Sequence, residues 1–143
     1  MAIKNYTTQV PANRSIAEIQ ASLVEHGAIG CMFGYDKQGR ISDLRFALLV
    51  NEAPVNFSLP VEWRRFQEVL KQQGIKRWDD EDYCYRVAWR NLRDWVLAQM
   101  TLYETEMVDM PQIFLPFAND ATGKTLYGKI MENPSFLLGN GKE

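Results

Sequence analysis

Three arginines, Arg86, Arg90 and Arg93, have the spacing of one face of a helix. At roughly 100° per residue, their side chains fall within an arc of about 60°. Guanidinium groups bind the oxygens of phosphates and carboxylates in pairs, so this edge could hold an anionic partner. Trp89 lies in the same stretch and could stack on a base or on an arginine. We therefore take Arg86, Arg90, Arg93 and Trp89 as the candidate ligand- or partner-binding residues.

The same arginines also have carboxylates at helical spacing. Asp82 precedes Arg86 by four residues, and Asp94 follows Arg90 by four, so both pairs could form local ion pairs. In that case the arginine face is the solvated flank of an amphipathic helix, which is the usual place for surface charge. The sequence leaves both interpretations open.

Residues 118–125, with the sequence ANDATGKT, match a relaxed phosphate-loop pattern. Only 18 residues follow Thr125, too few for the strands that a nucleotide-hydrolysing fold would need. Pro116 interrupts the segment that would lead into the loop as a strand. Gly123 is the only glycine available where the backbone would have to approach a phosphate. We predict an ordinary surface turn.

The remaining reactive residues form no recognisable site. His26 is the only histidine, and Cys31 and Cys84 have no closely spaced second ligand, so we expect no metal site and no cofactor. One histidine without a neighbouring motif does not complete a nucleophile–base pair, and we assign no catalytic residue. The acidic run Asp79–Asp82 suits the start of a helix better than a cation site. Catalysis by carboxylates alone stays open.

Length and composition favour one ordinary globular domain spanning residues 1–143. The net charge of −2 argues against a general nucleic-acid binder, although a local basic groove is compatible with it. Two unpaired cysteines favour a reducing, cytoplasmic setting. Residues 1–10 lack the apolar stretch of a secretory signal, and no apolar run is long enough to span a membrane.

Helical periodicity appears at several places in the chain. Ser15 is predicted to cap a first helix with Glu18 as its capping-box partner, and His26-Gly27 to end it. The further predicted helices cover residues 62–73, 82–107 and 125–132. The helix at 82–107 is the longest. Its apolar face comprises Tyr85, Ala88, Trp89, Leu92, Trp95, Val96, Met100, Tyr103 and Met107.

Strand signals lie mainly between residues 29 and 59. Residues 29–35 and 41–50 flank the turn sequence DKQGR and predict a hairpin, and the alternation at 55–59 predicts a third strand. Residues 4–10 are a β-favouring run, and 112–117 are predicted as a short strand or extended segment. Residues 133–143 are predicted as a docking tail. The predicted fold class is α+β: a small antiparallel sheet with an N-terminal helix, covered by C-terminal helices including one long amphipathic helix.

Four tryptophans are many for a small core. Trp63 lies beside Arg64 and Arg65, and Trp78 follows Arg77. Because Trp and Arg are enriched at interfaces, these positions could anchor a partner or a second subunit. The alternative is that the tryptophans fill the space between sheet and helices.

Several short segments from both ends of the chain are similar in sequence to known proteins. They are NYTT (5–8), SIAEIQ (15–20), HGA (26–28), RVAWR (86–90), DW (94–95), AQM (98–100), FLP (114–116) and GKTLY (123–127). Together they resemble a family of small proteins carried by bacteriophages and integrated mobile elements. The resemblance implies a protein that acts in the cytoplasm of a bacterial host, and it transfers no site residue.

These observations lead to three functional expectations. The first is a phage or mobile-element protein that acts by binding, as an inhibitor that blocks or sequesters a component of a host defence system. The second is a nucleic-acid accessory factor in replication or recombination, and the third is a nucleotide-acting enzyme that uses carboxylates. The expected partner is a host protein or a phosphate-bearing small ligand. Nucleic acid is less favoured, no membrane is expected, and a homo-oligomer stays open.

Overall fold

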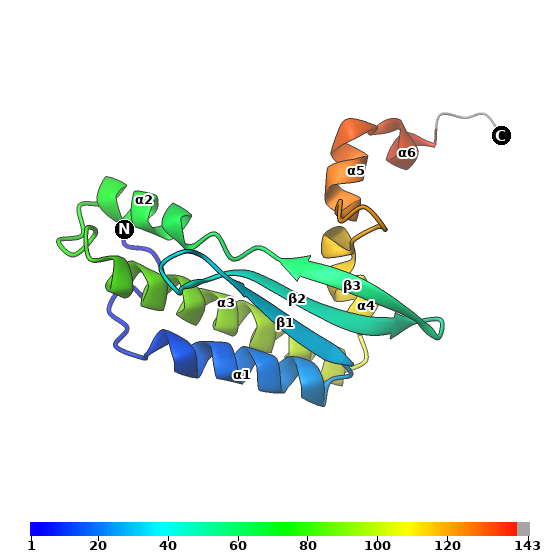
Figure 1. The fold of residues 1–143 in the computed structure, drawn as a ribbon, viewed down its shortest axis with the longest axis horizontal. Helices are drawn as coiled ribbons and strands as arrows, with labels where there is room; N and C mark the ends of the chain where they lie inside the picture. The colour runs from blue at the N-terminus through cyan, green and yellow to red at the C-terminus, as the bar shows by residue number, and fades with distance from the viewer. Residues whose placement is uncertain (140–143) are drawn as a thin grey trace.

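The computed structural model describes residues 1–139, apart from the side chain of Phe136 (Figure 1). The elements in chain order are α1 (Ala12–Glu25), β1 (Gly30–Tyr35), β2 (Ile41–Val50), β3 (Ala53–Leu59), α2 (Trp63–Gln72), α3 (Glu81–Glu104), α4 (Met110–Phe114), the 3-10 turn η1 (Leu115–Phe117), α5 (Leu126–Glu132) and α6 (Ser135–Leu138). The helices α1 and α3 lie side by side along the sheet, and α5 and α6 project beyond it. The predicted α+β class, with its N-terminal helix and long C-terminal helix, is confirmed.

The three strands form an antiparallel sheet in the order β1-β2-β3. Asp36 shapes the first hairpin because its Oδ1 accepts hydrogen bonds from the backbone of Gln38 and Arg40. The second hairpin turns at Asn51 and Glu52, which have φ values of 51° and 70°. This pair of left-handed residues is the geometry of a two-residue turn that matches the twist of the strands. The predicted hairpin and third strand are thus present, and β2 has the predicted bounds.

The sheet buries one face against α1, α3 and α4. Phe46 on β2 stacks on Phe57 of β3 at 5.3 Å between ring centroids and meets the edge of Phe114 at 5.0 Å. Trp95 of α3 closes the group with an edge contact to Phe114 at 5.9 Å. Alternate residues of β2 share this face because side chains of a strand alternate in direction. The core therefore lies between the sheet and the helices.

A second apolar cluster joins α2 to the first half of α3. Trp63 and Leu70 of α2 pack there with Cys84 and Val87 of α3. Arg40 and Arg64 both lie over the ring of Trp63, with guanidinium carbons 5.2 and 4.4 Å from its centroid. Trp63 is buried, and so is Trp89 in the main core, as the packing interpretation of the tryptophans expected.

Two predictions near the N-terminus are wrong. Residues 4–10 form turns and no strand, because their backbone finds no neighbouring strand to pair with in the described residues. The first helix starts at Ala12, after Pro11, and not at Ser15. Pro11 is the N-cap residue, with φ of −58° and ψ of 142°, and the helix therefore begins about one turn earlier than predicted. Ser15 therefore lies inside α1, fully buried, and Glu18 has no capping role.

The region after the long helix also differs from its prediction. The helix ends at Glu104, so Met107 lies beyond it. Residues 112–117 are not extended but belong to α4 and η1. Asp109 begins α4 through a reciprocal capping box with Gln112, and Pro111 lies in its first turn. The described part of the predicted tail contains α6, and residues 140–143 lie outside the described residues.

Within residues 1–139, no helix has the length and apolarity that crossing a membrane requires.

Candidate functional site

Glu18 on α1 binds two of the three candidate arginines. Its Oε1 accepts hydrogen bonds from Arg93 Nε at 2.8 Å and from Arg90 Nη1 at 3.2 Å, and Arg90 also reaches Ser15 Oγ at 3.4 Å. The side chains of Arg90 and Arg93 are only 18% and 26% exposed. Burial tends to raise the pKa of Glu18, but hydrogen bonds from Arg93 and Arg14 outweigh it, and this pKa lies below its ordinary value. An anionic ligand here must compete with Glu18.

Arg86 differs from the other two arginines. It has no carboxylate within ion-pair distance in residues 1–139, and its buried Nε has no hydrogen-bond partner there. Its guanidinium carbon lies 5.9 Å from the centroid of the Tyr83 ring. Trp89 is fully buried between α3 and the sheet, so its ring offers no surface to a ligand in this structure. Of the three candidate arginines, Arg86 is the one without a partner in the described residues; the buried Nε1 of Trp89 also has none there.

The predicted local ion pairs within the long helix do not form. Asp82 binds Arg40 at 2.7 Å, so it ties α3 to the first hairpin. Asp94 binds Lys4, Asn5 and Arg93. Burial tends to raise the pKa of Asp94, but hydrogen bonds from these three residues hold it down at about 2. Apart from the adjacent Arg93, these partners come from distant parts of the chain, which the i to i+4 spacing could not reveal.

A pocket that the sequence did not indicate lies next to Arg86. We call it the Tyr83 pocket; residues 6–9, residues 75–77 and Tyr83 line it, and its volume is about 260 Å³. The hydroxyl of Tyr83 donates a hydrogen bond to the carbonyl of Tyr6, which holds the N-terminal segment against α3. Lys76 and Arg77 supply positive charge. In the sequence, the position of Arg77 next to Trp78 was the only local feature that drew attention to this region.

The side of the sheet that faces away from the helices is open. We call it the outer sheet face; it comprises Met32, Arg45, Ala47, Leu49, Pro54 and Asn56, from all three strands. Met32 is 58% exposed and Leu49 54% exposed. A shallow hollow of about 220 Å³ lies between Met32, Ala47 and Asn56, because Gly30 and Ala47 leave room there. Exposed large apolar side chains gathered on one surface are typical of an interaction site.

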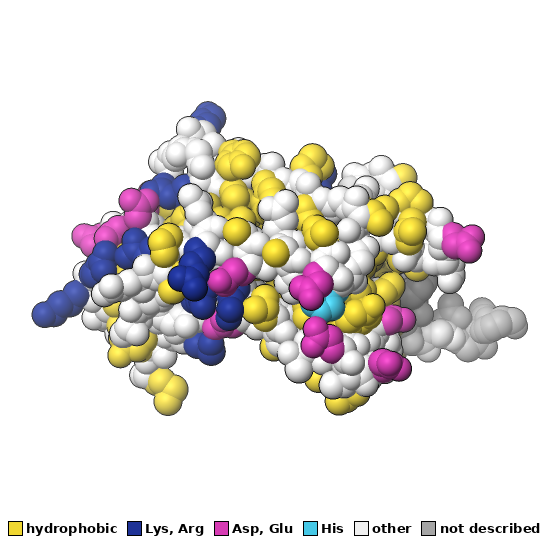
Figure 2. Space-filling view, turned by 90° about the horizontal axis from the view of Figure 1, so that it is seen from below, with side chains coloured by type: hydrophobic (Ala, Val, Ile, Leu, Met, Phe, Trp, Pro, Cys, Tyr) yellow, Lys and Arg dark blue, Asp and Glu magenta, His cyan; other side chains and the backbone are white. Residues whose placement is uncertain are grey.

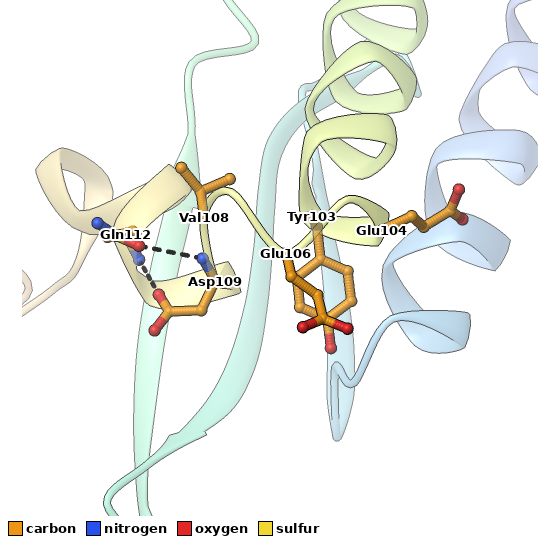
Figure 3. A pocket seen from close by; sticks show the side chains of 6 residues that line it. All are labelled: Tyr103, Glu104, Glu106, Val108, Asp109 and Gln112. Carbon is orange, nitrogen blue, oxygen red and sulfur yellow. Dashed lines mark hydrogen bonds between the residues drawn. The ribbon is translucent and has the colours of Figure 1, made fainter.

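Another hollow lies where the chain leaves α3, and Figure 3 shows the residues that line it. Glu104 points toward α1, where it binds His26, and Asp109 caps α4. Glu106 has a left-handed backbone with φ of 65° and lies near Tyr103. Of the three carboxylates that line this hollow, Glu104 and Asp109 stabilise neighbouring helices. We therefore assign these two residues a structural role. No cluster of potential metal ligands occurs in the described part of the chain.

His26 joins the ends of α1 and α3. Its Nδ1 donates to the carbonyl of Ser22 at 2.7 Å, and its Nε2 lies 2.9 Å from Glu104. Figure 2 shows this histidine, the only one in the chain, with acidic side chains beside it, while many Lys and Arg side chains gather toward the other end of the molecule. Both partners accept hydrogen bonds, so the arrangement suits a protonated imidazole.

The loop at residues 118–125 is closed by its own carboxylate. Asp120 Oδ1 accepts hydrogen bonds from the backbone of Thr122 and Lys124, at 2.8 and 3.0 Å, and from the Thr122 hydroxyl at 2.6 Å. The amine of Lys124 binds Glu132 at 2.6 Å. The groups that would hold a phosphate in a phosphate loop are therefore bound within the protein, as expected for a turn.

This chain matches no protein-family model, no curated protein and no solved structure. Its function is therefore argued from its own surfaces. Two of them have unused binding capacity: the outer sheet face with the edge of β1, and the Tyr83 pocket with Arg86.

Proposed function

We propose that this chain is a phage or mobile-element protein that binds a host protein through its sheet and thereby inhibits or sequesters a component of a bacterial defence system. The observation that carries the binding role is the outer sheet face, which exposes the apolar side chains of Met32 and Leu49 and is continuous with the free edge of β1. The host setting comes from the resemblance to phage and mobile-element proteins. Sequestration needs a binding surface and no catalytic group.

The edge of β1 supports this proposal. In the described sheet β1 pairs only with β2, so the backbone groups of its other edge have no paired strand. Its sequence, GCMFGY, contains no charged residue and no proline, the features that usually protect an exposed edge. An extended segment of a partner could add to this edge as a fourth strand, with backbone hydrogen bonds giving affinity.

Side chains of the outer sheet face would then give selectivity. Met32 lies directly beside the edge, and its flexible thioether adapts to different partner side chains. The hollow beside Ala47 has room for one inserted side chain. Arg45, held near Asp43 at 3.1 Å, adds a charged boundary to this apolar surface. A partner segment of alternating apolar and polar residues, with an acidic residue near Arg45, fits this pattern.

The proposal is tested by a matched pair of methionine substitutions. Met32→Asp places a charge on the outer sheet face, while Met107→Asp places the same charge on an exposed residue after α3. We expect Met32→Asp to keep the wild-type melting temperature but to lose both the partner and the effect on host defence, measured by phage plating and native mass spectrometry. We expect Met107→Asp to behave as wild type. Full activity of a folded Met32→Asp variant would reject the sheet as the binding surface.

The same preparations separate the other two functional classes. A nucleic-acid accessory factor would bind oligonucleotides with an affinity that falls steeply as salt rises. A carboxylate enzyme would turn over a panel of nucleotides. Either result, together with unchanged host defence, would replace the proposed function.

A further inference from the structure

Arg86 has a buried hydrogen-bond donor without an acceptor in the described residues. Its Nε is buried and has no hydrogen-bond partner within residues 1–139, and no carboxylate there lies within ion-pair distance. A buried donor left without an acceptor is unfavourable, and for a charged group the cost is larger still. Its neighbours Arg90 and Arg93 each have Glu18. A bound anion would supply what Arg86 lacks.

The packing of α1 and α3 places Arg86 beside the Tyr83 pocket. The two helices run parallel, and the contacts Arg90–Ser15 and Arg93–Glu18 both join residues 75 positions apart. By the same offset Arg86 corresponds to Pro11, two residues after Gln9, which lines the pocket. Arg86 also lies over the ring of Tyr83, which itself lines the pocket.

Further positive charge comes from the turn before α3. The guanidinium carbon of Arg77 lies 4.8 Å from the Tyr83 centroid, and Lys76 is exposed at the pocket with no ion pair in the described residues. Asp80 precedes α3 as its cap. It binds Arg77 at 2.7 Å and also accepts the backbone N–H of Tyr83. Lys76, Arg77 and Arg86 thus bring three positive charges to the surroundings of Tyr83, and the carboxylate of Asp80 is already engaged.

We propose that the Tyr83 pocket binds the phosphate group of a small phosphomonoester, with Lys76 and Arg77, which line it, and Arg86, which lies over the ring of Tyr83 beside it, as the cationic ligands. Guanidinium forks bind two phosphate oxygens at once, and the hydroxyls of Thr7 and Thr8 line the same pocket as further donors. The volume of about 260 Å³ lies near the lower limit for small-molecule sites, which favours a phosphate on a single sugar or nucleoside. The site shares no residue with the outer sheet face, so it does not depend on the proposed function.

Calorimetry with four probes tests the site: orthophosphate, ribose 5-phosphate, adenosine monophosphate and, without phosphate, adenosine. We expect saturable binding of the two phosphomonoesters, weaker binding of orthophosphate and none of adenosine. Arg86→Gln and Lys76→Gln should each weaken binding of the phosphomonoesters by at least about tenfold. The matched control is Arg65→Gln, which removes the same charge from an exposed arginine of α2 that is paired with Glu62. It should change the affinity by less than about twofold.

Three results would overturn the site. They are the absence of saturable phosphate binding, an equal loss of affinity in Arg65→Gln, and equal binding of adenosine and adenosine monophosphate. If orthophosphate binds as tightly as the phosphomonoesters, the ligand is the free ion and the proposed ligand class is wrong. Melting temperatures accompany each variant. Should Arg86→Gln fail to fold, Lys76→Gln decides, because its side chain is exposed and its loss removes no buried contact.

Discussion

Arg93 donates its Nε hydrogen to Glu18 Oε1 at 2.8 Å and so joins α3 to α1. The same oxygen accepts Arg90 Nη1 at 3.2 Å, so one carboxylate pairs with two of the three candidate arginines. These side chains are 18–30% exposed, between the surface and the interior. The arrangement makes Glu18 a structural residue of the helix pair.

Glu18→Gln should destabilise the protein, because the partly buried Arg90 would lose its ion-pair partner in the described residues and Arg93 would keep only Asp94. We expect a loss of about 1–2 kcal/mol, between the values for exposed and for fully buried ion pairs. Urea unfolding followed by circular dichroism measures it. Glu68→Gln is the control, since Glu68 is exposed on α2 and has no ion pair in the described residues. Equal stability of both variants would mean that the pairing does not hold the helices together.

Two residues of β2 test the assignment of the sheet faces. Phe46→Ala removes a ring that contacts Phe57 and Phe114, and we expect a loss of about 3–5 kcal/mol. Leu49→Ala, on the outer sheet face of the same strand, should cost less than about 0.5 kcal/mol. Guanidinium or urea titrations of both variants give the comparison. A large loss in Leu49→Ala would show that the outer sheet face is covered in solution.

His26 should make stability depend on pH. Burial lowers its pKa, but hydrogen bonds to Glu104 and the Ser22 carbonyl, with the charges of Glu104 and Glu25, outweigh this, and the pKa lies above its usual 6.5. The folded state therefore binds the proton more tightly than the unfolded chain does. The resulting stability is fully present below the unfolded pKa and is lost as pH rises through the folded pKa.

The measurement is the urea midpoint of wild type and His26→Gln between about pH 5 and about pH 9. The difference between the two proteins should be largest at the acid end and should shrink as pH rises through the folded pKa. Glu104→Gln should reduce the same pH dependence, because it removes the partner of Nε2. A difference that grows with pH would contradict the assigned direction of the pKa shift.

The two cysteines should differ in reactivity. Cys84 is fully buried and donates to the carbonyl of Trp78 at 3.2 Å; burial, with the charges of Asp80 and Glu81, raises its pKa to about 11. Cys31 is only half-buried, although burial raises its pKa too. A thiol reagent should therefore label Cys31 first and Cys84 only on unfolding. The variants Cys31→Ala and Cys84→Ala assign the two phases, and rapid labelling of Cys84 in the folded protein would contradict its burial.

Asp120 should hold the loop at residues 118–125, while Lys124 should not. Asp120→Ala removes the acceptor of the Thr122 and Lys124 backbone N–H groups, so their amide exchange should become faster. Lys124→Ala removes only a salt bridge to Glu132 at an exposed position and should leave exchange unchanged. Hydrogen-exchange mass spectrometry distinguishes the two variants. Nucleotide binding that disappears in Lys124→Ala would instead restore the phosphate-loop interpretation.

Local chemistry in the sequence determined much of the fold. The period of 3.6 residues located α3, and the turn residues Asp36 and Gly39 located the first hairpin, because each depends on neighbours in the chain. The end of α1 at His26-Gly27 followed for the same reason. Residues 112–117 were wrongly predicted as a short strand or extended segment. Asp109 and Gln112 form a capping box there, and Pro111 lies in the first turn of α4.

The sites were decided by the tertiary structure. Sequence placed Arg86, Arg90 and Arg93 on one helix face. It could not show that Glu18 from α1 pairs with two of them, or that Arg86 has no partner within residues 1–139. Ion pairs between segments 75 residues apart depend on how helices pack, and no local spacing encodes that. The open sheet face and the Tyr83 pocket arise in the same way, because they exist only where distant segments meet or leave a strand uncovered.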